Sequence, residues 1–236
     1  MTHTLAHLLT TLPLPYSVHG DPRTPITAPV VESDADVQPG GMFVARTGGS
    51  VDGHTFIDSA IARGAAAVVG EKPLSALGTL PVPYVQVEEA AFAVGWLASA
   101  WHGHPSHRLH VIGVTGTDGK TTTSTILHSI LQAATDRRAG LISTVNAVIG
   151  DETHDTGLHV TTPGAPRVQA LLARMVRTGL THVVLEMTSH GLAQGRLEGV
   201  AIDTAVLTNL THEHLDYHGT FEAYRAAKGR MFAMLE

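Results

Sequence analysis

The chain has 236 residues, of which 43% are hydrophobic and 15% are charged, so it can form one large or two modest globular domains. A formal net charge of −6 excludes the overall basic surface that nucleic-acid binding needs. The absence of cysteine excludes disulfide bonds and thiolate chemistry.

The first hundred residues alternate between helical and strand patterns. The opening residues lack a basic segment and a long apolar run, so we expect no signal peptide, no membrane span and a cytoplasmic location. Four leucines between positions 5 and 12 recur at helical spacing behind Thr4, a possible N-cap. Further strands are expected at 42–45, 65–69 and 84–87, and helices at 54–63 and 88–102. This alternation predicts a small α/β domain.

The segment 101–110, WHGHPSHRLH, interrupts the pattern with Gly103 and Pro105. We therefore expect a domain boundary near His107, which gives domains 1–107 and 108–236. The histidines of this segment could bind a metal. However, no pair of them has the spacing of a ligand set on a helix, so a linker with incidental histidines is favoured.

The stretch 109–125, LHVIGVTGTDGKTTTST, is the strongest single pattern in the chain. An apolar β-branched run predicts a buried strand, three glycines predict a tight loop, and Lys120 begins a helical pattern. Such a loop offers backbone N–H groups and a helix N-terminus to polyphosphate, with Lys120 for the outer phosphates and Thr121 for magnesium. Val114 replaces the first glycine of the common GxxxxGK[ST] motif, so the loop is a variant. A glycine-rich turn before a core helix is the alternative.

The second half of the chain predicts further helices and strands. The helix after the loop carries Ile126, Leu127, Ile130 and Leu131, a spacing that predicts one buried face. A helix at 166–178 should bury Val168, Leu171, Leu172 and Met175 and end at Gly179. The remaining predictions are strands at 141–145, 182–187 and 205–209, a polar loop at 151–163 and a helix at 221–235.

Polar side chains follow two of these strands. Glu186 stands at the end of strand 182–187, and the segment THEHLDYHG, which contains His214, follows strand 205–209. The carboxyl ends of parallel strands share one crevice, so Glu186 should face Lys120 there. The second segment suggests a polar pocket that contains a metal, although a solvated loop is equally compatible. Lys228 in the last helix would by itself be a solvated charge.

Several segments resemble the Mur ligases, most closely the MurE type. They are GTDGKTTT, the Thr161-Thr162-Pro163 loop, EMTSHGLAQGR at 186–196, TNLTHEHLDYHGT at 208–220, AAKGRMF at 226–232, and PGGMFVA and DGHTFI in the first domain. Those enzymes use ATP and Mg²⁺ to add the third stem-peptide residue to UDP-N-acetylmuramoyl-L-Ala-D-Glu in peptidoglycan synthesis. The resemblance implies a small α/β domain for the UDP substrate, followed by a mostly parallel phosphate-loop ATPase domain. The reaction implied is amide formation through an acyl phosphate.

The resemblance also implies roles for individual residues. The triphosphate would be held by Gly116, Thr117, Asp118, Gly119, Lys120, Thr121 and Thr122. The catalytic set would be Lys120, Glu186, His214 and Lys228, and the magnesium ligands would be Thr121, Glu186, His214 and Lys228, the lysine as a carbamate. The UDP-sugar-peptide would contact Asp34, Gly49, Ser50, Thr161, Thr162, Thr188, Ser189, Gln194 and Arg196.

The chain departs from the family pattern at several points. Asp118 replaces a usual Asn, Ser33-Asp34-Ala35 stands where Asp-Ser-Arg is usual, and Gly164 replaces a common Asp. Family members also continue beyond the modified lysine with the rest of the ATPase sheet and a third domain for the incoming amino acid. Unless the chain is a fragment of a longer protein, we therefore expect an incomplete sheet, marginal solubility or a separate C-terminal partner chain, and low or no complete ligase turnover.

Two other classes of function stay open. A truncated, catalytically silent homologue would bind UDP-sugar-peptide or nucleotide without turnover. A phosphate-loop NTPase of different purpose would bind ATP alone, and a folate-type glutamate ligase has a similar loop. The identity of the added amino acid, lysine or meso-diaminopimelate, is also open.

Overall fold

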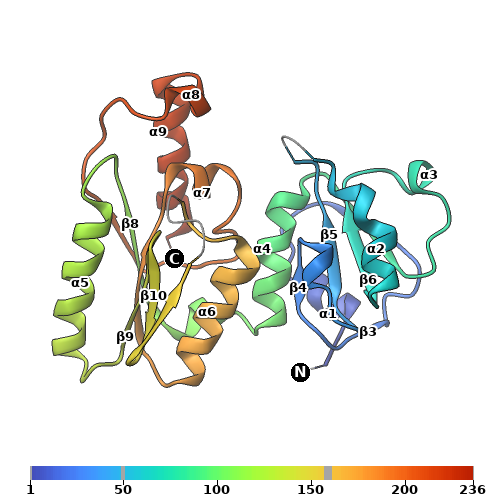
Figure 1. Cartoon of the computed structure of the whole chain (residues 1–236), viewed down its shortest axis with the longest axis horizontal. Helices are drawn as coiled ribbons and strands as arrows, with labels where there is room; N and C mark the ends of the chain where they lie inside the picture. Colours follow the sequence, from blue (N-terminus) through green and yellow to red (C-terminus); the bar gives the residue numbers. More distant parts are fainter. Residues whose placement is uncertain (1, 49–50, 157–160, 236) are drawn as a thin grey trace. The chain divides into compact units, whose positions relative to one another are not determined.

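A computed structural model describes residues 2–48, 51–156 and 161–235. The chain divides into two compact units, Met1–Trp101 and His102–Glu236 (Figure 1). Each unit is a largely parallel sheet with helices on its faces, which confirms the predicted α/β class. The division lies slightly before the boundary that the sequence predicts, because the short helix η3 (Pro105–Arg108) packs against α6 of the second unit. Within the described ranges, no helix is long and apolar enough to cross a membrane.

The first unit is built on a five-stranded sheet in the order β2-β7-β6-β5-β4. Strands β4 to β7 run parallel, and β2 joins the edge antiparallel to β7. Its strands are β2 (Tyr16–His19), β4 (Val30–Val31), β5 (Met42–Ala45), β6 (Ala67–Gly70) and β7 (Tyr84–Val87), with a separate pair β1 (His3–Thr4) and β3 (Pro25–Ile26). Its helices are α1 (Leu5–Leu9), η1 (Asp34–Asp36), η2 (Gly53–Phe56), α2 (Ile57–Ala62), α3 (Leu74–Leu77) and α4 (Ala90–Trp101).

Local chemistry accounts for these elements. Thr4 begins α1 by accepting a hydrogen bond from the His7 backbone N–H through its side chain, as its predicted N-cap role requires. Every residue of β5 and β6 is buried, the pattern of a parallel strand covered on both faces. Helix α2 packs on β5, and α4 packs on β4 and β5. Because β5, β6 and β7 are paired in parallel, their carboxyl ends lie at the same edge of the sheet.

The second unit is built on a six-stranded sheet in the order β11-β10-β9-β12-β8-β13. Strands β9, β12, β8 and β13 run parallel, while β10 and β11 form an antiparallel hairpin at the edge. The strands are β8 (His110–Thr115), β9 (Ala139–Ile142), β10 (Asn146–Ile149), β11 (Glu152–Asp155), β12 (His182–Glu186) and β13 (Thr204–Leu207). The helices are α5 (Lys120–Ala134), α6 (Ala165–Arg177), α7 (Ser189–Ala193), α8 (Leu215–His218), α9 (Phe221–Gly229) and η4 (Arg230–Met234).

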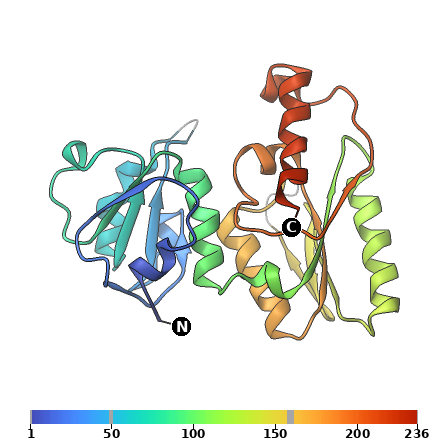
Figure 2. The same cartoon turned by 180° about the vertical axis from the view of Figure 1, so that it is seen from behind.

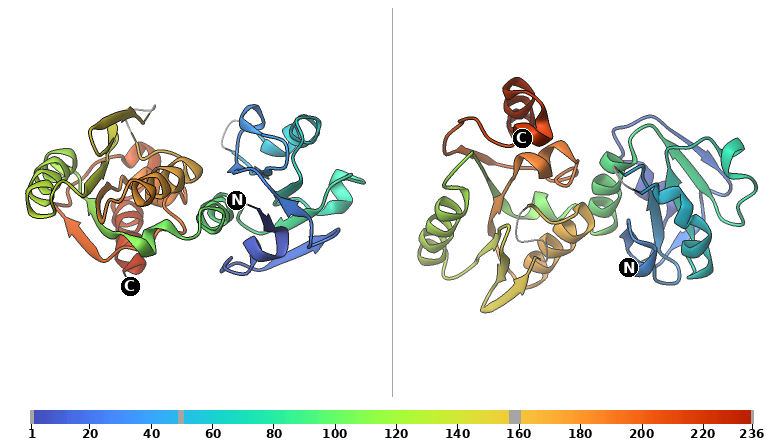
Figure 3. Two further views of the ribbon diagram at one scale, coloured as in Figure 1. Left: turned by 90° about the horizontal axis from the view of Figure 1, so that it is seen from below. Right: turned by 45° about the horizontal axis from the view of Figure 1, so that its top comes forward.

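Helices cover both faces of this sheet (Figure 3). Successive strand residues point to opposite faces, so Val111 and Val183 pack with the apolar side of α6, whereas Ile112 and Val184 pack with α5. The four residues predicted to face inward on α6 are all buried, and they pack in the same apolar cluster as Val111 and Val183. Helix α9 packs against α7 and α8 (Figure 2).

Four predictions for this unit are wrong in part. The strand expected at 141–145 lies at Ala139–Ile142, as β9. On α5 only Leu127 and Leu131 pack against the sheet, whereas Ile126 and Ile130 are 55% and 58% exposed because one helical position turns a side chain by about 100°. The predicted loop at 151–163 contains strand β11, whose polar residues pair with β10 across a turn. The predicted last helix changes to a 3-10 helix, η4, after Gly229.

Candidate active site

The loop between β8 and α5 is shaped by two glycines. Gly116 has a φ of +155°, and a Cβ there would collide with the Thr208 hydroxyl. Gly119 has a φ of +77° in the left-handed region and stands at the N-cap of α5 without a side-chain cap. The first backbone N–H groups of α5 are therefore not satisfied by a capping side chain, as expected of a helix that receives an anion.

Residues after β13 hold the loop from the other side. Asn209 Oδ1 accepts hydrogen bonds from the backbone N–H groups of Thr117 and Asp118 at 3.1 and 2.9 Å. The Thr208 hydroxyl donates to the Asp118 carbonyl at 2.6 Å. The Asp118 side chain itself is exposed and forms no ion pair with a described residue. The loop backbone is thus pre-organised before any ligand arrives.

Two lysines converge on this loop. Lys120 Nζ donates to the carbonyls of Gly116 and Thr117 at 2.9 and 2.7 Å, and Lys228 Nζ donates to the same Gly116 carbonyl at 2.5 Å. Lys228 is only 3% exposed, and this burial together with the charge of Lys120 lowers its pKa to about 8. Neither lysine is ion-paired with a described residue, so the pair creates a positive potential suited to phosphate.

A buried carboxylate faces the start of α5. Glu186 at the end of β12 is 2% exposed, and its oxygens accept hydrogen bonds from the Thr121 hydroxyl at 3.0 and 3.1 Å. The Thr144 backbone N–H is 3.4 Å from the same carboxylate. In the described part of the chain, Glu186 has no cationic partner. A hydroxyl and an uncompensated buried carboxylate are the oxygen ligands that Mg²⁺ prefers, so these residues fit that ion.

His214 stands at the N-cap of α8. It has a φ of +54°, and its imidazole stacks edge-on to His190 at 4.8 Å between ring centroids. Burial and the two neighbouring histidines, His214 and His218, lower the pKa of His190. Over the described ranges, no three or more His, Asp and Glu side chains are grouped to hold a metal by themselves. A cation here would therefore need water or phosphate oxygens as further ligands, which is usual for Mg²⁺.

These side chains line one cavity of about 320 Å³. Its walls are formed by Thr117, Asp118, Gly119, Lys120, Thr121, Thr122, Thr144, Glu186, Thr188, Ser189, His190, His214 and Lys228. The four residues of the predicted catalytic set, which come from four separate segments, are therefore brought together. Gly116 contributes its carbonyl to the lysines without being part of the wall.

The residues predicted to hold the UDP-sugar-peptide lie in two places. The hydroxyls of Thr161 and Thr162 lie 3.0 and 3.1 Å from that of Thr188, next to the cavity wall. Arg196 donates to the Thr162 carbonyl at 2.7 Å and to the Gln194 side chain at 2.9 Å.

Asp34 belongs to the first unit. Its carboxylate accepts a hydrogen bond from the Ser59 hydroxyl at 2.6 Å. Gly49 and Ser50 lie outside the described residues.

Several residues of the site were not predicted as such from the sequence, among them Thr208 and Asn209, which hold the loop. Thr144 and His190 line the cavity, and the Tyr224 hydroxyl lies 2.9 Å from the Thr117 hydroxyl of the loop. The Tyr224 ring also lies 4.7 Å beneath Lys228 Nζ. The sequence could have indicated Tyr224, because this residue precedes Lys228 by one helical turn and so lies on the same face of the helix. Thr144 carries no comparable signal.

The glycine loop, the converging lysines and the buried carboxylate at the carboxyl edge of a parallel sheet define a nucleotide-binding unit of the phosphate-loop class. Residues 114–236 match the Mur ligase middle domain, and residues 35–102 match the family described as Mur ligase family, catalytic domain. The chain belongs to the Mur ligase family, as its motifs predict.

Three named proteins illustrate what this chain is similar to. The UDP-N-acetylmuramyl-tripeptide synthetase of Roseiflexus sp. (strain RS-1) is 48% identical over 92% of this chain and 43% of its own length. A solved UDP-N-acetylmuramoyl-L-alanyl-D-glutamate--2,6-diaminopimelate ligase superposes with a TM-score of 0.83 at 31% identity, over all of this chain and 46% of that one. The MurF ligase from Thermotoga maritima, solved in complex with ADP, gives 0.58 at 26% identity, over 89% of this chain and 44% of that one. The chain spans less than half the length of each.

Proposed function

We propose that this chain supplies the UDP-substrate and ATP domains of an ATP-dependent ligase that adds the third amino acid to UDP-N-acetylmuramoyl-L-Ala-D-Glu. Residues 1–107 would bind the UDP substrate and residues 108–236 would bind ATP. The observation that carries the proposal is the cavity in which Lys120, Glu186 and Lys228 meet. The names of the relatives support the substrate and the reaction.

The proposed reaction has two steps. An oxygen of the substrate carboxylate attacks the γ-phosphorus of ATP, the bond to the bridging oxygen breaks, and an acyl phosphate and ADP form. The amine of the incoming amino acid then attacks the acyl carbon, and the tetrahedral intermediate expels phosphate and loses a proton to give the amide. Charge accumulates on oxygen in both steps, so the protein acts mainly by positioning the reactants and neutralising charge.

Individual residues have distinct parts in this scheme. The backbone N–H groups of 116–122 would hold the triphosphate, and Lys120 would leave the loop carbonyls for the outer phosphates. Thr121 and Glu186 would hold one magnesium, and His214 would serve a second. Bound magnesium would neutralise charge on the phosphate oxygens.

Lys228 would act as a carbamate. Its lowered pKa, about 8, leaves a larger share of neutral amine near neutral pH than an exposed lysine has. The neutral amine can add to CO₂ and release a proton, which turns a cation that repels magnesium into an anion that attracts it. The cationic form is already disfavoured by burial and by Lys120.

The residues proposed to contact the UDP-sugar-peptide come from both units. Thr161, Thr162, Thr188, Ser189, Gln194 and Arg196 would contact it from the second unit, and Asp34, Gly49 and Ser50 from the first. The guanidinium of Arg196 suits the anionic groups of this ligand because it presents several donors in a fixed plane. The amino acid would be bound by a further C-terminal domain, in the same or in a separate chain.

Calorimetric titration tests the proposal. The chain should bind UDP-N-acetylmuramoyl-L-Ala-D-Glu, and separately a non-hydrolysable ATP analogue with Mg²⁺. Binding of the nucleotide alone would contradict the UDP-substrate assignment, and binding of neither would contradict both assignments.

A non-catalytic binding module is the second candidate. The substitutions Asp118 and Ser33-Asp34-Ala35 favour it, because they alter the loop and a predicted substrate contact. Such a module would bind the UDP-sugar-peptide, the nucleotide or both, but form no acyl phosphate when it is supplied with ATP. Trapping the acyl phosphate by borohydride reduction would distinguish the two candidates.

A further inference from the structure

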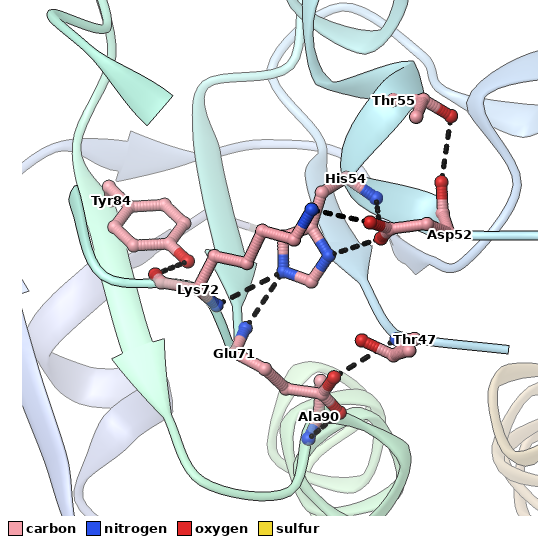
Figure 4. A network of polar contacts seen from close by, with 8 residues as sticks. All are labelled: Thr47, Asp52, His54, Thr55, Glu71, Lys72, Tyr84 and Ala90. Atoms are coloured by element: carbon pink, nitrogen blue, oxygen red, sulfur yellow. Dashed lines mark hydrogen bonds and ion pairs between the residues drawn. The ribbon is translucent and has the colours of Figure 1, made fainter. Parts of the chain in front are cut away.

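The turn after β6 connects the carboxyl ends of three neighbouring strands in the first unit (Figure 4). The Glu71 carboxylate accepts one hydrogen bond from the Thr47 N–H, after β5, and one from the Ala90 N–H, at the start of α4 after β7, both at 3.0 Å. The Tyr84 hydroxyl of β7 donates to the Lys72 carbonyl at 2.6 Å. Residues 71 and 72 thus form a clamp across β5, β6 and β7.

His54 is the buried side chain that fastens this clamp to the segment after β5. Its Nε2 accepts hydrogen bonds from the backbone N–H groups of Glu71 and Lys72 at 3.0 and 3.3 Å. Because Nε2 is the acceptor, the ring proton lies on Nδ1, which donates to Asp52 Oδ1 at 2.6 Å. The other Asp52 oxygen pairs with the Lys72 ammonium. The imidazole therefore has both nitrogens engaged and one defined tautomer.

The surrounding backbone is shaped for this imidazole. A Cβ at Gly70 would lie 2.8 Å from both His54 Nε2 and the Tyr84 hydroxyl, so only glycine permits their approach to the end of β6. A turn does not explain glycine at this position, since Gly70 is paired with Ala45 within the sheet. Its role is to make room for the clamp.

The clamp shapes the connection from β5 to η2. Thr47 forms an isolated bridge with Asp52, the Gly53 N–H donates to the Arg46 carbonyl at 2.9 Å, and the Gly48 N–H donates to the Val51 carbonyl at 3.0 Å. This connection stands at the carboxyl edge of the parallel strands, where open α/β sheets bind their ligands. An apolar side chain in place of His54 would leave the N–H groups of Glu71 and Lys72 without this acceptor, whereas the imidazole holds them and fixes the direction of the connection.

We propose that Asp52, His54 and Glu71 are positioning residues for the nucleotide end of the UDP substrate. They hold the described ends of the β5–η2 connection, residues 46–48 and 51–52, in the shape that the uridine diphosphate meets. His54 acts through Asp52 and the turn at Glu71, without contacting the ligand. This inference rests on the proposed function of the first unit.

Two substitutions of His54 separate the halves of the clamp. His54→Asn places an amide N–H near the position of Nδ1, so it keeps the bond to Asp52 but leaves the N–H groups of Glu71 and Lys72 unpaired. His54→Gln places an amide oxygen near the position of Nε2, so it keeps those bonds and loses Asp52. Leu8→Val, buried in the same unit at α1, is the control for loss of stability without loss of the clamp.

The readout is calorimetric affinity for UDP-N-acetylmuramoyl-L-Ala-D-Glu, measured below each variant's unfolding temperature. His54→Asn should weaken binding by roughly tenfold or more, because two partly buried donors lose their partner, while His54→Gln, which loses only the bond to Asp52, should weaken it by about threefold. Leu8→Val should bind like the unmodified chain, and all variants should bind the ATP analogue with Mg²⁺ equally well.

Two results would overturn the positioning role. One is unchanged affinity in His54→Asn, and the other is an equal loss in Leu8→Val, which would reduce the clamp to a stabilising contact. If the unmodified chain binds the ATP analogue but not the UDP compound, the proposed function of the first unit fails and the inference fails with it. Titration of the unmodified chain with both ligands detects that outcome before any variant is made.

Discussion

Replacing Lys228 with methionine should stabilise the second unit near neutral pH. The side chain is 3% exposed, and burial together with Lys120 lowers its pKa from 10.5 to about 8. This difference of about 2.5 corresponds to about 3 kcal/mol by which the folded state disfavours the ammonium, at about 1.36 kcal/mol for each pKa unit. Methionine has a similar length and no charge, and the Gly116 carbonyl keeps its hydrogen bond from Lys120. We therefore expect a gain of about 1–3 kcal/mol at pH 7.

The gain should depend on pH in a defined direction. The folded-state pKa of Lys228 lies below the unfolded one, so between pH 8 and 10.5 the unfolded chain keeps a proton that the folded chain has released. The stability of the unmodified chain relative to Lys228→Met therefore rises with pH across this window. The advantage of the variant is full below pH 8 and disappears as the pH approaches 10.5.

Urea unfolding in bicarbonate-free buffer at pH 7 and pH 10 measures this effect. Both tryptophans, Trp96 and Trp101, belong to the first unit, so a transition seen by circular dichroism but not by fluorescence reports on the second. In a Lys120→Met background the gain should shrink, because part of the repulsion is already gone. A Lys228→Met chain less stable than the unmodified one at pH 7, or a difference independent of pH, would refute the reasoning.

Three further substitutions test the nucleotide site by titration with an ATP analogue. Tyr224→Phe removes the hydrogen bond to Thr117, and since that bond is worth about 0.5–1.5 kcal/mol, affinity should fall by about two- to tenfold; an unchanged Kd would show that the hydroxyl does not shape the loop. Asp118→Asn removes an exposed carboxylate beside the phosphates, so affinity should rise, and the gain should shrink in 0.5 M salt; a gain that salt leaves intact would rule out charge as its cause. Glu186→Gln should abolish most of the increase in affinity that Mg²⁺ produces while leaving metal-free binding within about threefold, whereas an intact Mg²⁺ effect would exclude Glu186 from the metal site.

Patterns that depend on near neighbours in the chain were predicted well. The strand, glycine loop and helix around Lys120 are encoded by residue types with strong local preferences, and strands 42–45 and 84–87 have the predicted bounds. Helix α6 buries the predicted residues because its apolar positions follow the helical period closely. The motif order also carried the family assignment, which needs no coordinates.

Features that depend on partners distant in sequence were decided by the tertiary structure. Strand β11 has a polar sequence typical of a loop and becomes a strand only because β10 offers it a partner. Ile126 and Ile130 are as apolar as their neighbours Leu127 and Leu131, and only the direction of the sheet selects which pair is buried.

The same holds for the chemistry of the site. The sequence around Lys228 indicates an ordinary charged residue. In the fold, Lys228 and Lys120, which are over a hundred positions apart, donate to the same Gly116 carbonyl. The lowered pKa of Lys228 arises from that meeting and from burial, and neither is a property of the residues around it in the chain. The sequence by itself thus determined the elements with strong local patterns and the residues that can bind phosphate and magnesium. Only the packing of distant segments decided the lowered pKa of Lys228, since electrostatic energies depend on distances and burial that no local pattern encodes.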